Sequence, residues 1–201
     1  MLNNLPAQSR FFYCLYYSLL ELLGGDKADN VFSAAQLDPF DLIAPEYFNN
    51  GSLIIEKISS ELCALFGEDA ARGLLIRMGS ASMVFFRKYF AGIAQLGSIE
   101  NRLKPLNRRF SASLTKLAEV LSAETGTPQN IIERETRSYE WQMNKTRFNS
   151  TGEWFEPYFY FGLLEEFCSW LDSRKNYVLN YTAVEDHNSL EVISVEIREM
   201  E

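Results

Sequence analysis

The chain has 201 residues, of which 47% are hydrophobic and 23% charged, so it is long enough for one well-buried core and has an ordinary globular composition. Its net charge of −8 disfavours a general nucleic-acid binder, because contact with phosphates requires an excess of lysine and arginine. The unusual feature is the aromatic content, since 15 Phe and 10 Tyr can fill a core, cover a subunit interface or line a pocket.

The cysteines Cys14, Cys63 and Cys168 are widely spaced and each lies among apolar residues. This pattern is typical of buried thiols in a reducing compartment and lacks the paired spacing of a zinc site. The first ten residues lack the basic and apolar regions of a signal peptide, and no apolar run approaches the roughly 20 residues of a membrane span. We therefore expect a cytoplasmic protein with no membrane span.

The first predicted helix, residues 9–23, carries apolar residues on almost every side. Such a helix is buried or lies in an interface, and Gly24 and Gly25 provide a C-terminal cap. Residues 26–50 hold two prolines among short apolar groups, which predicts short helices joined by turns.

Two further helices are predicted on either side of Gly67. In residues 51–66 one apolar stripe has helical spacing: Ile54, Ile58, Leu62 and Leu65. The next helix starts at Glu68 and runs out near Gly92 and Gly97.

The middle of that second helix, residues 79–82, contains only small side chains between two bulky apolar blocks. A glycine inside a helix costs about 1 kcal/mol relative to alanine, so Gly79 requires a packing or functional reason. Close helix packing is one reason, and space for a ligand beside Met78 and Met83 is the other.

The second half of the chain changes period. An amphipathic helix carries a stripe that ends before Gly126 and Pro128: Phe110, Leu114, Leu117 and Leu121. Alternation in residues 139–143 predicts a half-buried strand. Pro157 opens a helix whose stripe is Tyr160, Leu163, Leu164, Phe167 and Leu171. Residues 177–197 alternate on both sides of a polar turn, as in a hairpin.

This order predicts an α+β fold, with a helical N-terminal half packed on one face of an antiparallel sheet that follows the order strand, helix, strand, strand. The order and several phrases resemble the 4-vinyl reductase, or hydrocarbon-binding, domain family: "YSLLELLGG", "LCALFGEDAARGLLIRMGSASMVFF", "FYFGLLEEFCSWL" and "NYVLNYTAVEDHNSLEVISVEI". The similarity covers residues 9–197. It implies a helical extension at residues 1–50 packed on the same core as a ligand-binding domain at residues 51–201.

The family's fold is related to heme-type nitric-oxide sensor domains and to Bet-type subunits of TRAPP tethering complexes. The resemblance implies binding of a small hydrophobic molecule, such as a tetrapyrrole or aromatic compound, often in a dimer and often for regulation or assembly. Many family members carry a cysteine–glycine–cysteine arrangement at the last hairpin. The matching stretch here has no cysteine, so a metal role is not carried over.

Catalytic and cofactor patterns have little support. His187 is the only histidine and stands in a polar turn, so neither heme ligation nor a histidine-based triad is expected. Glu165 and Glu166 are adjacent on a helix and diverge by about 100°, so solvation accounts for them better than acid–base catalysis. Glu133 and Glu135 lie beside arginines and suggest surface ion pairs. Neither a dinucleotide nor a P-loop pattern occurs, so NAD and ATP have no support.

The segment at residues 102–109 is basic, with Arg102, Lys104, Arg108 and Arg109. It is read either as a solvated loop and helix start or as a docking site for a carboxylate or phosphate.

The aromatic clusters are read either as one core or as a ligand pocket between helices and sheet. Arg137 is a candidate anchor for an acidic ligand group, because it shares the side of Tyr139 and Trp141 if the strand alternation extends that far. The pocket candidates are Met78, Gly79, Met83, Phe86, Arg137, Tyr139, Trp141, Tyr160 and Phe167.

The leading hypothesis is a non-catalytic domain that binds a small hydrophobic ligand and dimerises, or binds a partner protein, through its apolar first helix. The alternative is a protein-interaction or assembly module without a ligand. The third hypothesis is a tetrapyrrole vinyl reductase or accessory enzyme. It ranks last, because no redox cofactor pattern or proton donor stands out.

Overall fold

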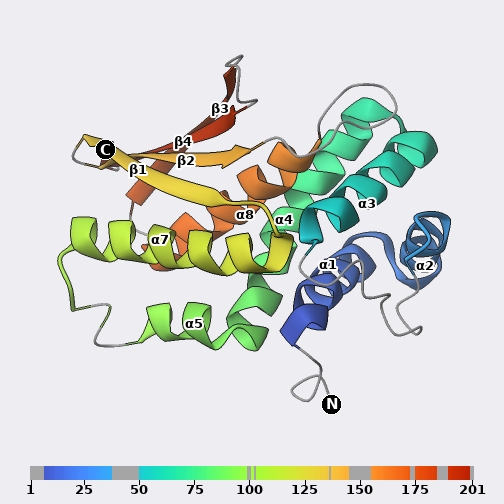
Figure 1. Ribbon diagram of the computed structural model, residues 1–201, viewed down its shortest axis with the longest axis horizontal. Helices are drawn as coiled ribbons and strands as arrows, with labels where there is room; N and C mark the ends of the chain where they lie inside the picture. Colours follow the sequence, from blue (N-terminus) through green and yellow to red (C-terminus); the bar gives the residue numbers. More distant parts are fainter. Residues whose placement is uncertain are drawn as a thin grey trace.

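A computed structural model describes residues 7–37, 50–98, 101, 103–135, 137–144, 155–172, 175–184 and 190–199. Within these ranges the chain is α+β, as predicted: a helical half is followed by an antiparallel sheet with one helix inserted between its strand pairs (Figure 1). No helix of the described part is long and apolar enough to cross a membrane.

Glycines separate α1 from α2 and α3 from α4, as the sequence indicates. Helix α1 spans Ala7–Leu23 and α2 spans Gly25–Ala34, with Gly24 between them at φ 80°. Helix α3 spans Gly51–Phe66 and α4 spans Glu68–Tyr89, with Gly67 between them at φ 82°. A left-handed backbone of this kind carries no steric penalty for glycine.

The apolar stripe of α3 is buried except at its last member. Ile54, Ile58 and Leu62 are buried, but Leu65 is 54% exposed. The prediction was therefore wrong at Leu65, because the helix end has passed beyond the edge of the core.

The C-terminal helices follow the predicted stripes. Helices α5 (Ala91–Ala94) and η3 (Gln95–Gly97) end the α4 region, and α7 spans Leu106–Thr125 up to Gly126, which has φ 70°. Helix α8 spans Glu156–Leu171 with its proline in the first turn. Every member of the two predicted stripes on α7 and α8 is buried.

The sheet has the strand order β1-β2-β4-β3, and every pair of neighbours is antiparallel. The strands are β1 (Gln129–Glu135), β2 (Ser138–Asn144), β3 (Lys175–Val184) and β4 (Leu190–Glu199). The predicted hairpin of β3 and β4 is confirmed, whereas β1 extends the predicted order by one strand at the edge.

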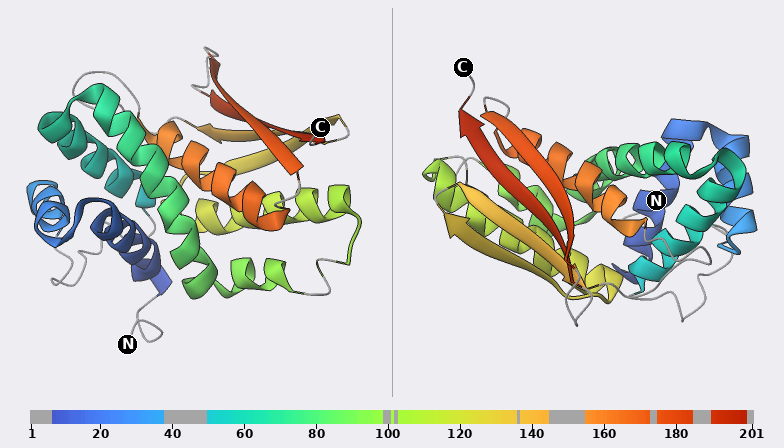
Figure 2. Two further views of the ribbon diagram at one scale, coloured as in Figure 1. Left: turned by 180° about the vertical axis from the view of Figure 1, so that it is seen from behind. Right: turned by 90° about the horizontal axis from the view of Figure 1, so that it is seen from above.

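Helices α7 and α8 cover the same face of the sheet (Figure 2). Tyr139, Trp141 and Met143 of β2 point to this face and are buried. On the opposite face Arg134 of β1 pairs with Glu140 of β2, their Nη2 and Oε2 atoms 2.8 Å apart. The helices α1, α2 and α3 gather at the other end of the molecule, and α4 runs between the two groups (Figure 1).

Helix α1 belongs to the same hydrophobic core as the rest of the chain. Its Phe11, Cys14, Leu15 and Leu19 are buried within one continuous cluster that also includes residues of α4, α7 and α8. The division of the chain at residue 50 stays a prediction.

Candidate ligand-binding site

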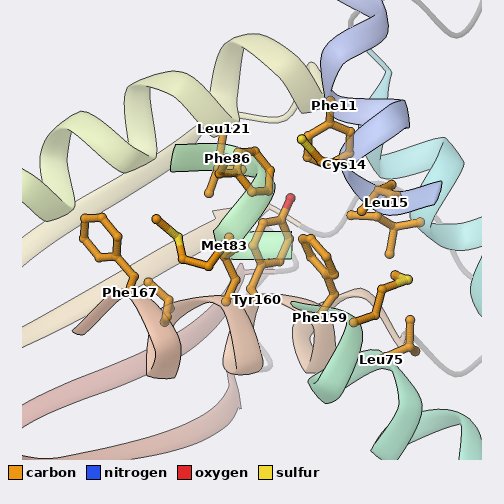
Figure 3. Close-up of a cluster of buried hydrophobic side chains, with 14 of the residues drawn as sticks. Phe11, Cys14, Leu15, Leu75, Met83, Phe86, Leu121, Phe159, Tyr160 and Phe167 are labelled. Atoms are coloured by element: carbon orange, nitrogen blue, oxygen red, sulfur yellow. The ribbon is translucent and has the colours of Figure 1, made fainter. Parts of the chain in front are cut away.

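Most of the predicted pocket residues meet in one closed core. Eight of them are buried: Met78, Gly79, Met83, Phe86, Tyr139, Trp141, Tyr160 and Phe167. Met83 and Phe86 of α4 converge with Tyr160 and Phe167 of α8, and Phe11 of α1 and Leu121 of α7 lie around them (Figure 3). These side chains therefore belong to the interior between the helices and the sheet, where they contact protein atoms.

Arg137, the ninth predicted residue, lies apart from this core. It is half-buried in the turn before β2, with a φ of 73°. The pairing of β1 with β2 is irregular between Glu133 and Glu135, so the alternation of β2 does not extend back to Arg137. Its position beside Tyr139 on the inner face is therefore not found.

The small side chains in the middle of α4 permit α4 and α8 to cross with their backbones in contact. A Cβ atom at Gly79 would lie 2.0 Å from the carbonyl oxygen of Phe159, and one at Gly162 would lie 1.8 Å from that of Ile76. Ser80 donates from Oγ to the carbonyl of Gly162 at 3.0 Å. Gly79 therefore permits the close packing of α4 against α8.

Two buried hydrogen-bond donors, one on β2 and one on α7, lack partners. Trp141 Nε1 and Ser113 Oγ are fully buried, and neither makes a hydrogen bond to a described residue. Buried donors without acceptors are rare, and each costs about 1–3 kcal/mol. The interior therefore lacks an acceptor at each of these two points, which water or a ligand can supply.

Two hydrogen bonds fix which side of α7 faces the sheet. Tyr139 donates from its hydroxyl to the carbonyl of Asn107 at 3.3 Å, near the start of α7. Gln129, which pairs with Met143, donates its backbone N–H to Ser122 Oγ at 2.9 Å, near the end of α7. Ser113 precedes Ser122 by nine residues, a rotation of about 180° around the helix, so it points away from β1, and only Trp141 is an unpartnered donor on the inner face of the sheet.

A buried polar network surrounds the hydroxyl of Tyr160. Tyr160 and Ser52 donate to Glu156 Oε1 at 3.2 and 2.7 Å, and Gln129 Nε2 lies 2.8 Å from the Tyr160 hydroxyl. Thr127 Oγ1 lies 2.9 Å from Ser52 Oγ. Burial, followed by the charge of Glu156, raises the pKa of Tyr160 well above its usual value, so its phenol keeps its proton.

The direction of these hydrogen bonds fixes the amide of Gln129. Tyr160 donates its single hydroxyl proton to Glu156 Oε1, so it accepts its other bond from Gln129, whose amide nitrogen therefore faces it. The other amide atom, Gln129 Oε1, is buried and has no donor among the described residues. Together with Trp141, it makes the inner face of the sheet polar at isolated points.

Surface grooves lined by described residues lie away from the predicted pocket. One of about 630 Å³ lies between α7 and β1, and one of about 490 Å³ lies beside α5 and the start of α7. A third, of about 320 Å³, lies between α2 and α3.

The predicted basic segment divides in the structure. Arg109 is buried and pairs with Asp172, with Nη2 and Oδ2 3.6 Å apart, and it donates to the carbonyl of Leu171 at 3.1 Å. Lys104 and Arg108 are at least partly exposed, and Arg102 lies outside the described residues. The solvated interpretation was wrong for Arg109, which joins α7 to the end of α8.

The other polar candidates do not form a catalytic group in the described ranges. Glu165 is exposed and Glu166 is half-buried, while Arg134 pairs across the sheet with Glu140 instead of with Glu133 or Glu135. His187 lies outside the described residues.

The described residues do not fit heme. Heme iron is held by histidine, cysteine thiolate, tyrosinate, or methionine with histidine. Burial raises the pKa values of the Cys14 and Cys168 thiols and of the Tyr160 phenol above their usual ranges, so all three stay protonated. The described part of the chain contains no histidine and no cluster of three metal-ligating residues.

Comparisons with known proteins identify the fold. No protein-family model and no curated protein sequence matches the chain. An oxygen-binding H-NOX domain related to soluble guanylate cyclases, in its oxygen complex, superposes with a TM-score of 0.63 and 14% identity, covering 96% of this chain and 95% of the other.

Two further solved structures give the same result. A variant of the T. tengcongensis H-NOX protein matches with a TM-score of 0.62 and 14% identity, covering 96% of this chain and 98% of the other. A variant of the Fe(II) unliganded H-NOX protein from K. algicida matches with a TM-score of 0.59 and 12% identity, covering 96% and 97%. The chain therefore has the fold of H-NOX domains.

Proposed function

We propose that this protein is a non-catalytic domain that binds a small hydrophobic molecule between its helices and its sheet, for sensing, carriage or assembly. The supporting observation is the buried Trp141 Nε1, a donor with no acceptor in the described structure. The fold shared with a solved oxygen-binding H-NOX domain adds support. Similarity at this identity carries only the fold, so the ligand is argued from the residues of this chain.

The ligand that fits these residues is flat, mostly apolar and bears one hydrogen-bond acceptor. Phe110, Tyr139 and Phe167 supply aromatic surface in the layer that holds Trp141. Burial, followed by the charge of Glu133, raises the pKa of Tyr139 to about 12, so its phenol stays neutral. An aromatic alcohol or ketone has this chemistry, and a metal-free tetrapyrrole offers several acceptors on a flat, largely apolar ring. Both belong to the ligand class that the resemblance to 4-vinyl reductase domains implies.

Native mass spectrometry and an absorption spectrum of freshly purified protein test this function. We expect a co-purifying hydrophobic molecule, or saturable binding of added protoporphyrin IX or 2-naphthol. The absence of any bound molecule together with no binding of either probe contradicts the proposal.

A matched ligand pair tests the role of Trp141. 2-Naphthol carries an acceptor that naphthalene lacks, and one hydrogen bond in a buried site is worth about 1 kcal/mol or more. We expect roughly tenfold tighter binding of 2-naphthol by the natural protein, and equal binding of both probes by Trp141→Phe. An unchanged preference in the variant places the polar contact at another residue.

A second candidate function, a protein-assembly module in the cytoplasm, is favoured by aromatic side chains on the outer side of α1 and α4. Tyr13, Tyr17, Phe85 and Tyr89 are each half-buried, and Tyr17 stacks on Phe85 with ring centroids 5.7 Å apart. A dimer through this surface agrees with the apolar character of α1.

Sedimentation of the natural protein and of Tyr17→Ser measures this association. A dimer that dissociates in the variant supports the assembly function. A monomer at all concentrations contradicts the assembly function, and ligand binding by that monomer supports the first function.

A further inference from the structure

The outer edge of β1 presents backbone groups that the sheet does not use. Strand β1 lies at the end of the strand order, next to β2 alone. Gln129 directs its N–H and C=O to the hydroxyl of Ser122, at 2.9 and 3.4 Å, and therefore not to β2. In an antiparallel ladder such residues alternate with those that bond to the neighbour, so Ile131 and Glu133 also direct their backbone groups outward.

Ser122 occupies the first position of this edge, as a backbone peptide group of an added strand would. Its hydroxyl accepts from the N–H of Gln129 at 2.9 Å and lies 3.4 Å from the carbonyl of the same residue, while its single proton has a nearer acceptor in the carbonyl of Ala118 at 2.7 Å. Beyond it, the backbone of Ile131 has no hydrogen-bond partner outside the ladder among the described residues. A bulge between Glu133 and Glu135 ends the regular edge, so the usable stretch runs from Gln129 to Glu133.

A groove of about 630 Å³ lies along this edge. Its walls come from two elements and are formed by Thr115, Ala118, Glu119, Ser122 and Ala123 of α7 and by Gln129, Asn130 and Ile131 of β1. The short side chains of Ala118, Ser122 and Ala123 leave space for alternate side chains of an extended chain. Strands that add to a sheet edge gain affinity from backbone hydrogen bonds and specificity from such pockets.

The charge around the groove is acidic. Glu119 lies in its wall, and Glu133 and Glu135 are exposed on the continuation of β1. Lys116 pairs with Glu119 at 2.9 Å and offsets its charge, whereas Arg134 pairs with Glu140 on the opposite face of the sheet. The negative charge along the groove's continuation therefore comes from Glu133 and Glu135. The whole chain carries a net charge of −8, which disfavours a second copy and favours a basic occupant.

We propose that the groove between α7 and β1 docks an extended, basic segment of a partner protein, which pairs with the backbone of Ile131 and Glu133 as an additional strand. This surface is separate from the interior ligand site, so either can exist without the other.

Hydrogen exchange and fluorescence polarisation with designed peptides test the proposal on the full chain. A peptide of alternating lysine and valine is expected to bind saturably and to slow exchange of the Ile131 and Glu133 amides. Its glutamate–valine counterpart is expected to bind at least tenfold more weakly. No binding of the lysine–valine peptide, or binding without protection of these two amides, overturns the proposal.

Two variants separate strand pairing from general charge attraction. Ile131→Pro removes an outward N–H that β2 does not use, and proline is tolerated at sheet edges. We expect at least a tenfold loss of peptide affinity, whereas Ile131→Val keeps the N–H and binds as the natural protein does. Ala123→Arg places a long cation in the groove from an exposed helix position, so it removes binding even if the proline variant does not fold. Unchanged affinity in Ala123→Arg contradicts the assignment.

Discussion

Gly79 of α4 and Gly162 of α8 face each other's helix backbone: a Cβ atom at either glycine would lie within 2.0 Å of a carbonyl oxygen of the partner helix. The two helices thus approach as closely as their backbones permit. This close approach accounts for a glycine at both positions, although glycine lowers the stability of its own helix relative to alanine.

We predict that Gly79→Ala and Gly162→Ala each lower the free energy of unfolding by about 1–3 kcal/mol or more, because the added methyl group forces the helices apart. Gly73→Ala is the matched control in α4, since a Cβ atom there meets nothing within 4 Å. It is expected to raise stability by up to about 1 kcal/mol through helix propensity. Denaturant unfolding measures all three, and equal effects at Gly73 and Gly79 contradict the close contact.

Glu124 gives the stability a predictable pH dependence. Burial raises the pKa of this carboxyl to about 7, although the nearby Arg10 cation opposes the shift. An unfolded glutamate titrates near 4.3, so between the two values the native state binds more protons than the unfolded state. Stability therefore falls as pH rises through this window.

We expect Glu124→Gln to remove this part of the pH dependence. The natural protein should lose on the order of 1 kcal/mol relative to the variant between the two pKa values, a figure reduced for the partial exposure of the group. Urea unfolding of both proteins across this range gives the difference. If the unfolding free energies of the two proteins change with pH in parallel, the Glu124 carboxyl is solvated and the prediction is wrong.

The buried network around Glu156 makes Tyr160 sensitive to loss of its hydroxyl. Tyr160→Phe leaves Gln129 Nε2 with only a long contact to Thr125 and removes one donor from Glu156. We expect a loss of about 1–3 kcal/mol in the free energy of unfolding. Tyr158→Phe, two residues earlier on the half-buried side of α8, should change stability by less than about 0.5 kcal/mol. Similar losses in both variants exclude a special role for the network.

The three free cysteines should differ in reactivity. Cys14 and Cys168 are fully buried, and burial raises the pKa values of both thiols, whereas Cys63 is half-buried. Because thiolates are the reactive species, iodoacetamide at neutral pH should label Cys63 first in the folded protein. Mass spectrometry of labelled peptides measures the order, and early labelling of Cys14 indicates opening of α1.

The sequence predicted the helices well where apolar spacing and glycines coincide. Gly67 and Gly126 end α3 and α7 with a left-handed backbone, and such ends are readable because few other residues adopt this conformation. Strand β1 was less readable, because its second half is exposed and charged at the sheet edge, so its side chains show no clear alternation.

The candidate site was only partly predictable. Apolar patterns identified Trp141 and Tyr160 as interior residues, but a pattern of this kind does not distinguish a packed core from a lined pocket. Ser113, Gln129 and Glu156 were not predicted, since they are polar residues within or at the ends of elements. Their burial depends on contacts between α3, α7, α8 and β1, which are distant in the chain.

The crossing of α4 and α8 also sets an order for folding. The ribosome synthesises the helices of the N-terminal half before α8. The surface of α4 around Gly79 therefore stays exposed until the C-terminal half has been synthesised. Contacts between segments this far apart form slowly, because the intervening chain must first be closed into a loop. Newly made chains that stop before α8 should therefore expose an apolar helix face and aggregate, and they should depend on chaperones more than the complete chain does.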